Sequence, residues 1–137
     1  MSTEESASPE MTHPEHAAEP KQGSLFRIVL IILLVLAVIA LVIDRRSQSS
    51  AQELHDSLVK MYDSAPPRDK PKMEAVREKI GFEPAATYDH DKAPNMKVEE
   101  YRYRGGLPWR NYTVYVYYRT MPEERMYSVS LNQPEDL

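Results

Sequence analysis

The pattern of apolar and polar residues separates one continuous apolar run from the rest of this chain. Eighteen of the nineteen residues at 25–43 are apolar, and Arg27 is the exception. At about 1.5 Å per residue such a run forms a helix roughly 28 Å long, close to the hydrocarbon thickness of a bilayer. Arg27 lies near one end, where its long side chain can reach the headgroups. The run predicts a single membrane-spanning helix, followed by a short juxtamembrane linker at residues 44–50.

A cleavable signal peptide is the main alternative for this run. The run is longer than the ~7–15 apolar residues of a signal peptide, and the segment before it is acidic where a signal peptide is basic. The charged sequence Asp44-Arg45-Arg46 follows at once and is typical of a stop signal. We therefore expect the helix to stay in place as an anchor.

Residues 1–24 have the composition of a disordered tail. They contain five Glu, one Lys and three Pro and are almost devoid of apolar residues. Such a segment cannot bury enough surface to offset the entropy of folding.

Lys and Arg are equally frequent on the two sides of the apolar run, so the positive-inside rule does not decide the orientation of the helix in the membrane. Because a short tail before a first spanning helix usually stays in the cytoplasm, we expect the C-terminal domain on the non-cytoplasmic side.

The residues after the linker, 51–137, carry the periodicities of a small domain that begins with a helix. Ser50 and Glu53 form an S-x-x-E capping box, which predicts a helix start near Ala51. The prolines at 66–67 end this helix. Its apolar stripe consists of Leu54, Leu58, Met61 and Tyr62.

A second helix is predicted shortly afterwards. Asp69 is a possible N-cap and Gly81 is placed for a C-cap. The apolar residues between them have helical spacing: Met73, Val76 and Ile80.

The remaining sequence predicts an antiparallel sheet. Four runs have strand-like texture: 85–90, 96–104, 111–119 and 126–131. Gly105–Gly106 marks a turn, which Pro108 makes longer than two residues. Val98 is out of phase with Tyr101, so a bulge is expected at Glu99–Glu100. The fold class predicted is α+β, with one N-terminal transmembrane helix and then two helices packed on a three- to four-stranded antiparallel sheet.

Alternation assigns the side chains of the last two strands to faces. One face of 111–119 is expected in the core, under the helices. It carries Tyr112, Val114, Val116 and Tyr118. In the last strand, one face is expected to carry Tyr127, Val129 and Leu131.

The second face of 111–119 is the candidate binding surface. Tyr115 and Tyr117 lie on it, and Arg102 or Arg119 can flank them. Tyr and Arg dominate binding hot spots, so a protein or peptide partner is the expected ligand. Trp109 is a further candidate, although we favour a place for it in the core, because a lone exposed Trp is uncommon.

Charge argues against nucleic acid as the partner. Residues 47–137 carry fifteen acidic and thirteen basic side chains, whereas a nucleic-acid-binding domain is usually basic. The absence of Cys excludes disulfides, thiolate metal sites and thiol nucleophiles. No cofactor motif is evident, so no cofactor is expected.

The alternative function is a hydrolytic or metal-dependent enzyme that uses Asp89, His90 and Asp91. These are metal-ligand residue types. Successive strand residues point to opposite faces, however, so three in a row converge only if the loop curls. We therefore expect no metal site and favour a non-enzymatic binding or scaffold role at the membrane surface.

Residues 72–85, KMEAVREKIGFEPA, add a resemblance. A helix, Ile80-Gly81 and then Pro84 before a sheet resemble the small lipoprotein subunit of the outer-membrane β-barrel assembly machinery and the related β-lactamase-inhibitor-protein-like domains. This chain departs from them because Pro84 comes one residue late and a spanning helix replaces the lipidated Cys. The resemblance implies an envelope-facing protein-binding scaffold, with no functional residue carried over.

Overall fold

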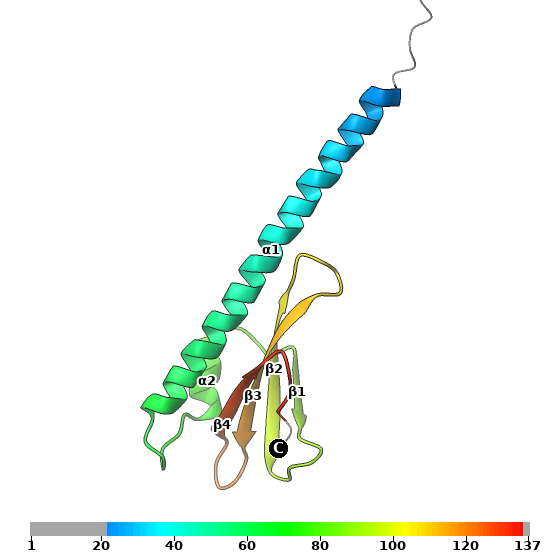
Figure 1. Cartoon of the computed structure of the whole chain (residues 1–137). Helices are drawn as coiled ribbons and strands as arrows, with labels where there is room; N and C mark the ends of the chain where they lie inside the picture. Colours follow the sequence, from blue (N-terminus) through cyan, green and yellow to red (C-terminus); the bar gives the residue numbers. More distant parts are fainter. Residues whose placement is uncertain (1–21, 136–137) are drawn as a thin grey trace, which may run out of the picture.

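The structure is a computed structural model that describes residues 22–135, so most of the predicted acidic tail lies outside the described residues (Figure 1). It confirms an α+β fold with a four-stranded antiparallel sheet in the order β1-β2-β3-β4. The elements in chain order are α1 (Gln22–Ser64), α2 (Met73–Ile80), β1 (Ala86–Asp89), β2 (Met96–Arg104), β3 (Asn111–Arg119) and β4 (Arg125–Leu131).

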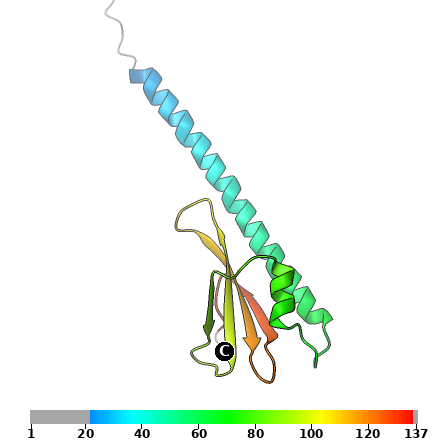
Figure 2. The same ribbon diagram turned by 180° about the vertical axis from the view of Figure 1, so that it is seen from behind.

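The predicted spanning helix and the predicted first domain helix are one element. α1 is helical without a break from Gln22 to Ser64, so the helix start expected near Ala51 is wrong and residues 44–50 are helical. One part of α1 is long and apolar enough to cross a membrane, and its apolar side chains are exposed. Both ribbon views show this part extending past the sheet (Figures 1 and 2).

Packing explains why the helix does not restart at Ser50. Ala51 and Leu58 are completely buried, and Leu54 and Tyr62 pack against the same core. A helix that already has this tertiary support needs no local start signal, since most helical stability in proteins comes from packing.

The second helix is shorter than predicted at its start. α2 begins after Lys72, so the expected N-cap at Asp69 is wrong; the Asp69 carboxylate accepts a 2.6 Å hydrogen bond from Arg125 instead. The C-cap is confirmed. Gly81 has a left-handed φ of 80°, and its N–H donates to the Arg77 carbonyl at 2.9 Å.

The two long strands have the predicted bounds, but the predicted bulge is wrong. β2 and β3 pair without interruption from Met96↔Arg119 to Arg104↔Asn111. The irregularity lies instead between β3 and β4, where Tyr117 is opposite Ser128 and Tyr118 is opposite Met126. Tyr127 is the extra residue, which corrects its predicted place on the face of Val129 and Leu131.

The main core lies between the helices and one face of the sheet, as predicted. The four residues assigned to the core face of β3 are all buried there: Tyr112, Val114, Val116 and Tyr118. Glu99 is also buried on this face. It accepts hydrogen bonds from Arg77 Nε at 2.7 Å and from the Tyr101 hydroxyl at 2.8 Å. A smaller cluster of Met96, Val98 and Tyr117 lies on the other face of the sheet.

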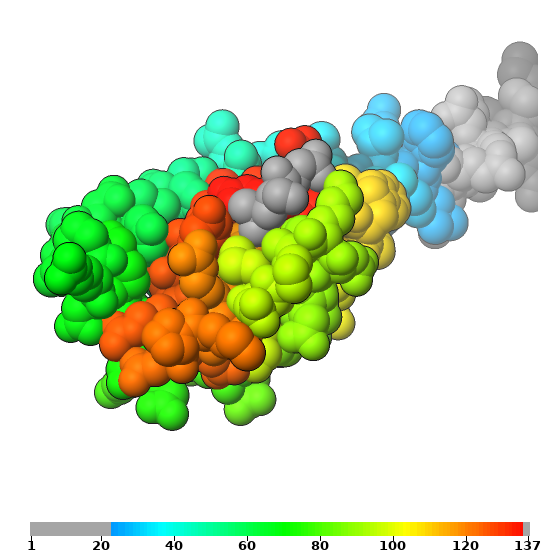
Figure 3. Space-filling view, turned by 90° about the horizontal axis from the view of Figure 1, so that it is seen from below, coloured from blue at the N-terminus to red at the C-terminus, as the bar shows by residue number. Residues whose placement is uncertain are grey.

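The end of the sheet away from the β2–β3 hairpin is closed by two loops. Figure 3 shows the β3–β4 loop (orange) beside the β1–β2 loop (yellow-green), with α1 leading away behind them. The Thr120 N–H donates to the Asn95 carbonyl at 2.8 Å, and this hydrogen bond connects the end of β3 to the β1–β2 loop. The apolar part of α1 and this loop end are therefore at opposite ends of the molecule.

Candidate interaction surface

The five predicted binding residues do not form one site. Tyr115 and Arg102 lie on the sheet face away from the helices, as predicted. Arg119 lies at the loop end of β3, with its guanidinium 5.2 Å from the Tyr127 ring. Trp109 lies beyond the opposite end of β3, in the hairpin loop, and is 77% exposed, so its predicted place in the core is wrong.

Tyr117 has the predicted orientation, but it is completely buried. The C-terminal segment 132–135 returns over this face, and the Glu135 N–H donates to the Tyr117 hydroxyl at 2.7 Å. The Asn132 side chain accepts a 3.1 Å hydrogen bond from the Thr113 N–H, which holds the start of the same segment. Tyr117 is therefore unavailable as a contact residue while this segment is in place.

The part of the face that stays open is organised around Glu100. One carboxylate oxygen of Glu100 accepts from the Tyr88 hydroxyl at 3.0 Å, and the other accepts from Arg102 Nε at 3.0 Å. Tyr115 is the residue opposite Glu100 on β3. We call these four residues the Glu100 cluster: Tyr88, Glu100, Arg102 and Tyr115.

The electrostatics of the cluster favour a fixed array of neutral rings beside an ion pair. Burial, together with the Glu100 hydrogen bond, raises the pKa of Tyr88 to about 12. Burial and the charge of Glu100 also raise the pKa of Tyr115. The hydrogen bond to Glu100 raises the pKa of Arg102, whose side chain is half exposed. The cluster can present a cation and two phenols to a partner in a defined geometry.

Strand β1 places this cluster next to a free sheet edge. β1 is the first strand of the sheet and pairs with β2 alone among the described strands. Its four residues are mostly exposed. Free edge strands can accept an extended peptide as an additional strand, so the cluster and the edge together suit a protein segment as ligand.

Asp89, His90 and Asp91 do not form a metal-ligand group in the described part of the chain. No group of three or more His, Asp or Glu side chains within residues 22–135 is arranged to hold a metal ion. The Nδ1 atom of His90 accepts hydrogen bonds from the N–H groups of Lys92 and Ala93, both at 3.2 Å. His90 therefore stabilises the turn after β1, while Asp89 pairs with Lys97 in the sheet.

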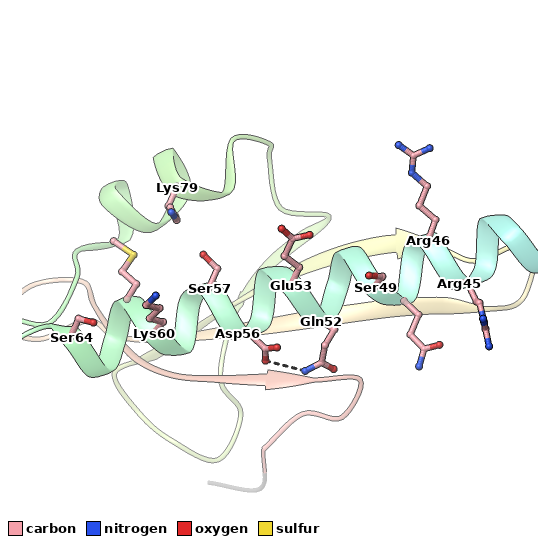
Figure 4. A pocket seen from close by; sticks show the side chains of 12 residues that line it. Arg45, Arg46, Ser49, Gln52, Glu53, Asp56, Ser57, Lys60, Ser64 and Lys79 are labelled. Carbon is pink, nitrogen blue, oxygen red and sulfur yellow. Dashed lines mark hydrogen bonds between the residues drawn. The ribbon is translucent and has the colours of Figure 1, made fainter.

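An open groove runs along α1 (Figure 4). Asp56 lines this groove, and its carboxylate forms hydrogen bonds with Gln52 at 2.9 Å and with His55 at 3.0 Å. Both hydrogen bonds lower the pKa of Asp56, and the one with His55 has the larger effect. The groove mixes both charges: its ionic residues are Arg45, Arg46, Glu53, Asp56, Lys60 and Lys79. Because these charges do not converge on one point, the groove defines no particular ligand.

Sequence reasoning missed a cluster around Asp44, which joins α1 to the β2–β3 hairpin. The Asp44 carboxylate accepts a 2.9 Å hydrogen bond from the Tyr112 hydroxyl and lies 3.3 Å from the Arg110 guanidinium. Its other oxygen is 3.4 Å from the Gly106 N–H. One turn later, the Ser47 hydroxyl donates to the Arg104 carbonyl. The only sequence signal here was the charged Asp44-Arg45-Arg46, which indicated a stop and not a contact.

Comparison of the chain with known protein families, with curated proteins and with solved structures found no match. The resemblance of residues 72–85 to the small lipoprotein subunit stays a prediction. Function therefore has to be inferred from the residues of this chain.

Proposed function

We propose that this protein is a single-pass membrane protein whose small α+β domain acts as a non-enzymatic binding or scaffold module at the membrane surface. The observation that carries the proposal is the continuity of α1. The same helix exposes an apolar segment of spanning length and then buries Ala51 and Leu58 in the core of the domain.

A continuous helix favours a scaffold because it fixes where the domain stands. A flexible linker would allow the domain to sample many heights and orientations above the bilayer. In this chain, the contacts of Asp44 and Ser47 with the hairpin hold the domain against the helix directly after the apolar segment. The Glu100 cluster is then presented in one orientation, on the sheet face away from α1.

The proposed partner is a protein segment that contacts Tyr115 and Arg102. A photo-cross-linking amino acid at position 115 of the full-length chain, in its native membrane, should give a discrete adduct. Arg102→Ala should reduce the yield of that adduct several-fold, because the guanidinium is a charged contact held by Glu100.

The matched control is the same photo-cross-linker at Met121, which is 65% exposed in the β3–β4 loop, six residues beyond Tyr115 in the chain. It should give no adduct of that size. An identical adduct from both positions, or one that Arg102→Ala leaves unchanged, would show that the Glu100 cluster is not the binding surface.

A further inference from the structure

The β2–β3 hairpin reaches back along the apolar part of α1. Gly106 is so close to the helix that a Cβ atom at this position would stand 1.6 Å from the Ala40 carbonyl oxygen. Only glycine permits this approach. Ala40 is three residues inside the apolar run that ends at Ile43, which corresponds to about 4.5 Å along the helix axis. Figures 1 and 2 both show the hairpin rising beside α1.

The residues beyond Gly106 are apolar and exposed. Trp109 is 77% exposed and Leu107 is 37% exposed, with the exposed Pro108 between them. In water this arrangement would be costly, since burying a large aromatic side chain is worth roughly 1.5–3 kcal/mol. At a membrane surface it is favourable, because Trp is enriched where headgroups meet acyl chains.

Basic side chains surround the same level of α1. Arg45 and Arg46 follow the apolar run, and Figure 4 shows them pointing to different sides of the helix. Arg104 precedes the hairpin glycines and is exposed, while Arg110 follows the tip and is paired with Asp44. Guanidinium groups beside exposed apolar residues are complementary in charge to the phosphate layer of a lipid bilayer.

We propose that residues 107–109 are a second membrane contact. The tip of the β2–β3 hairpin inserts into the interfacial layer of the leaflet on the domain side, where the apolar run of α1 ends. The Trp109 ring then lies between headgroups and acyl chains. The inference rests on the proposed membrane span and adds to it a specific docking of the domain on the lipid surface. The Asp44 contacts then serve to keep the hairpin at the correct height.

The sequence supplies its own probe, because Trp109 is the only Trp in the chain. The full-length protein is reconstituted into vesicles of phosphatidylcholine and phosphatidylglycerol, without any other protein. We expect blue-shifted Trp emission, strong quenching by lipids brominated high on the acyl chain, and weak quenching by aqueous acrylamide.

The matched control is the double variant Trp109→Phe, Met121→Trp, which moves the single Trp to the exposed loop at the other end of the sheet. Its emission should stay red-shifted, and its acrylamide quenching constant should be several-fold higher. If Trp109 is quenched by acrylamide as strongly as the control, the hairpin is in water and the inference is wrong. Shielding of Trp109 in native membranes but not in lipid vesicles would also overturn it and would indicate a protein partner.

Alkaline extraction of the same vesicles separates the two proposals. A chain that stays with the lipid while Trp109 remains in water would overturn the hairpin contact and leave the membrane span in place. A chain that alkali removes from the lipid would overturn both.

Discussion

At the scale of single residues, the core contains a buried carboxylate. Glu99 is completely buried, and a buried carboxylate is costly unless it is paired and hydrogen-bonded. Arg77 and Tyr101 provide these partners. The Tyr118 hydroxyl is buried nearby and makes no well-formed hydrogen bond with the described residues, although its pKa responds to Glu99 and Tyr101. Polar chemistry in this core is therefore centred on one carboxylate and two tyrosines.

These tyrosines give the domain a dependence on alkaline pH. Burial raises the pKa values of both Tyr101 and Tyr118 above their ordinary value, and the interaction with Glu99 is the second-largest cause. In the unfolded chain a tyrosine loses its proton near pH 10. Above that pH the folded state holds more protons than the unfolded state, so stability is full below about pH 10 and falls as pH rises, by about 1.4 kcal/mol per pH unit for each tyrosine.

We predict that Tyr118→Phe and Tyr101→Phe differ in the free energy of unfolding at pH 7 but share a flatter loss of stability above pH 10. Tyr118→Phe removes a hydroxyl without a well-formed hydrogen bond and should leave the free energy of unfolding equal or up to about 1 kcal/mol higher. Tyr101→Phe removes a hydrogen bond to a charged group and should cost about 1.5–3 kcal/mol. Both should flatten the loss of stability above pH 10. Chemical denaturation of the full-length protein in detergent, from pH 7 to 11, measures all three effects.

If Tyr118→Phe loses stability above pH 10 as steeply as the wild-type chain does, Tyr118 is not protected from ionisation in the folded state. Tyr127→Phe is the matched control, because this tyrosine is exposed and lies outside the cluster around Glu99.

At the scale of elements, α1 decides how the apolar segment is coupled to the domain. The helix continues through residues 44–50. Asp44 and Ser47 contact the β2–β3 hairpin, and the side chains between them are exposed. The apolar segment and the domain should therefore move together as one body.

We predict that Ser49→Pro uncouples them. Proline removes the hydrogen bond to the carbonyl four residues earlier and kinks the helix, at a cost of about 3 kcal/mol. Because the chain has no Cys, spin labels can be placed uniquely at Val29→Cys in the apolar segment and Glu123→Cys in the β3–β4 loop. The distance distribution should be narrow in the parent and broad or shifted in the proline variant.

Ser49→Ala is the control, since it keeps the helix and should keep the narrow distribution. A distribution that is already broad in the parent chain would mean that α1 bends in the bilayer. A narrow distribution in Ser49→Pro would mean that the hairpin contacts alone hold the domain.

At the scale of the whole molecule, the proposed membrane span allows two orientations of the domain. Lys and Arg are balanced across the apolar run, so local charge does not decide between them. We predict a non-cytoplasmic domain. In intact cells a membrane-impermeant maleimide should label Glu123→Cys and should fail to label Ser6→Cys in the N-terminal segment until the membrane is permeabilised. The reverse labelling pattern would place the domain in the cytoplasm.

Much of the fold could be predicted because its signals are local. The bounds of β2 and β3 and the core face of β3 follow from alternation, and the end of α2 follows from Gly81. The apolar segment follows from composition alone. Each of these features depends on residues that are neighbours in the sequence, so the printed chain contains the necessary information.

Little of the candidate site could be predicted in the same way. Alternation gave Tyr117 the correct side of the sheet, but the segment that covers it lies fifteen residues further along the chain. The side chain of Trp109 is exposed because the hairpin extends beside α1 and not over the core. The bulge lies between β3 and β4, where the pairing of two strands decides it, and so the irregular phase of β2 was misleading.

The sequence by itself therefore determined the apolar segment, the bounds of β2 and β3 and the end of α2, since side-chain periodicity and turn chemistry act over a few residues. Only the tertiary structure decided that α1 continues unbroken into the domain, that Glu99 is buried with Arg77, and that Gly106 meets Ala40. The physical reason is that burial and ion pairing depend on groups far apart in the chain. Their free energy appears only when folding brings those groups together.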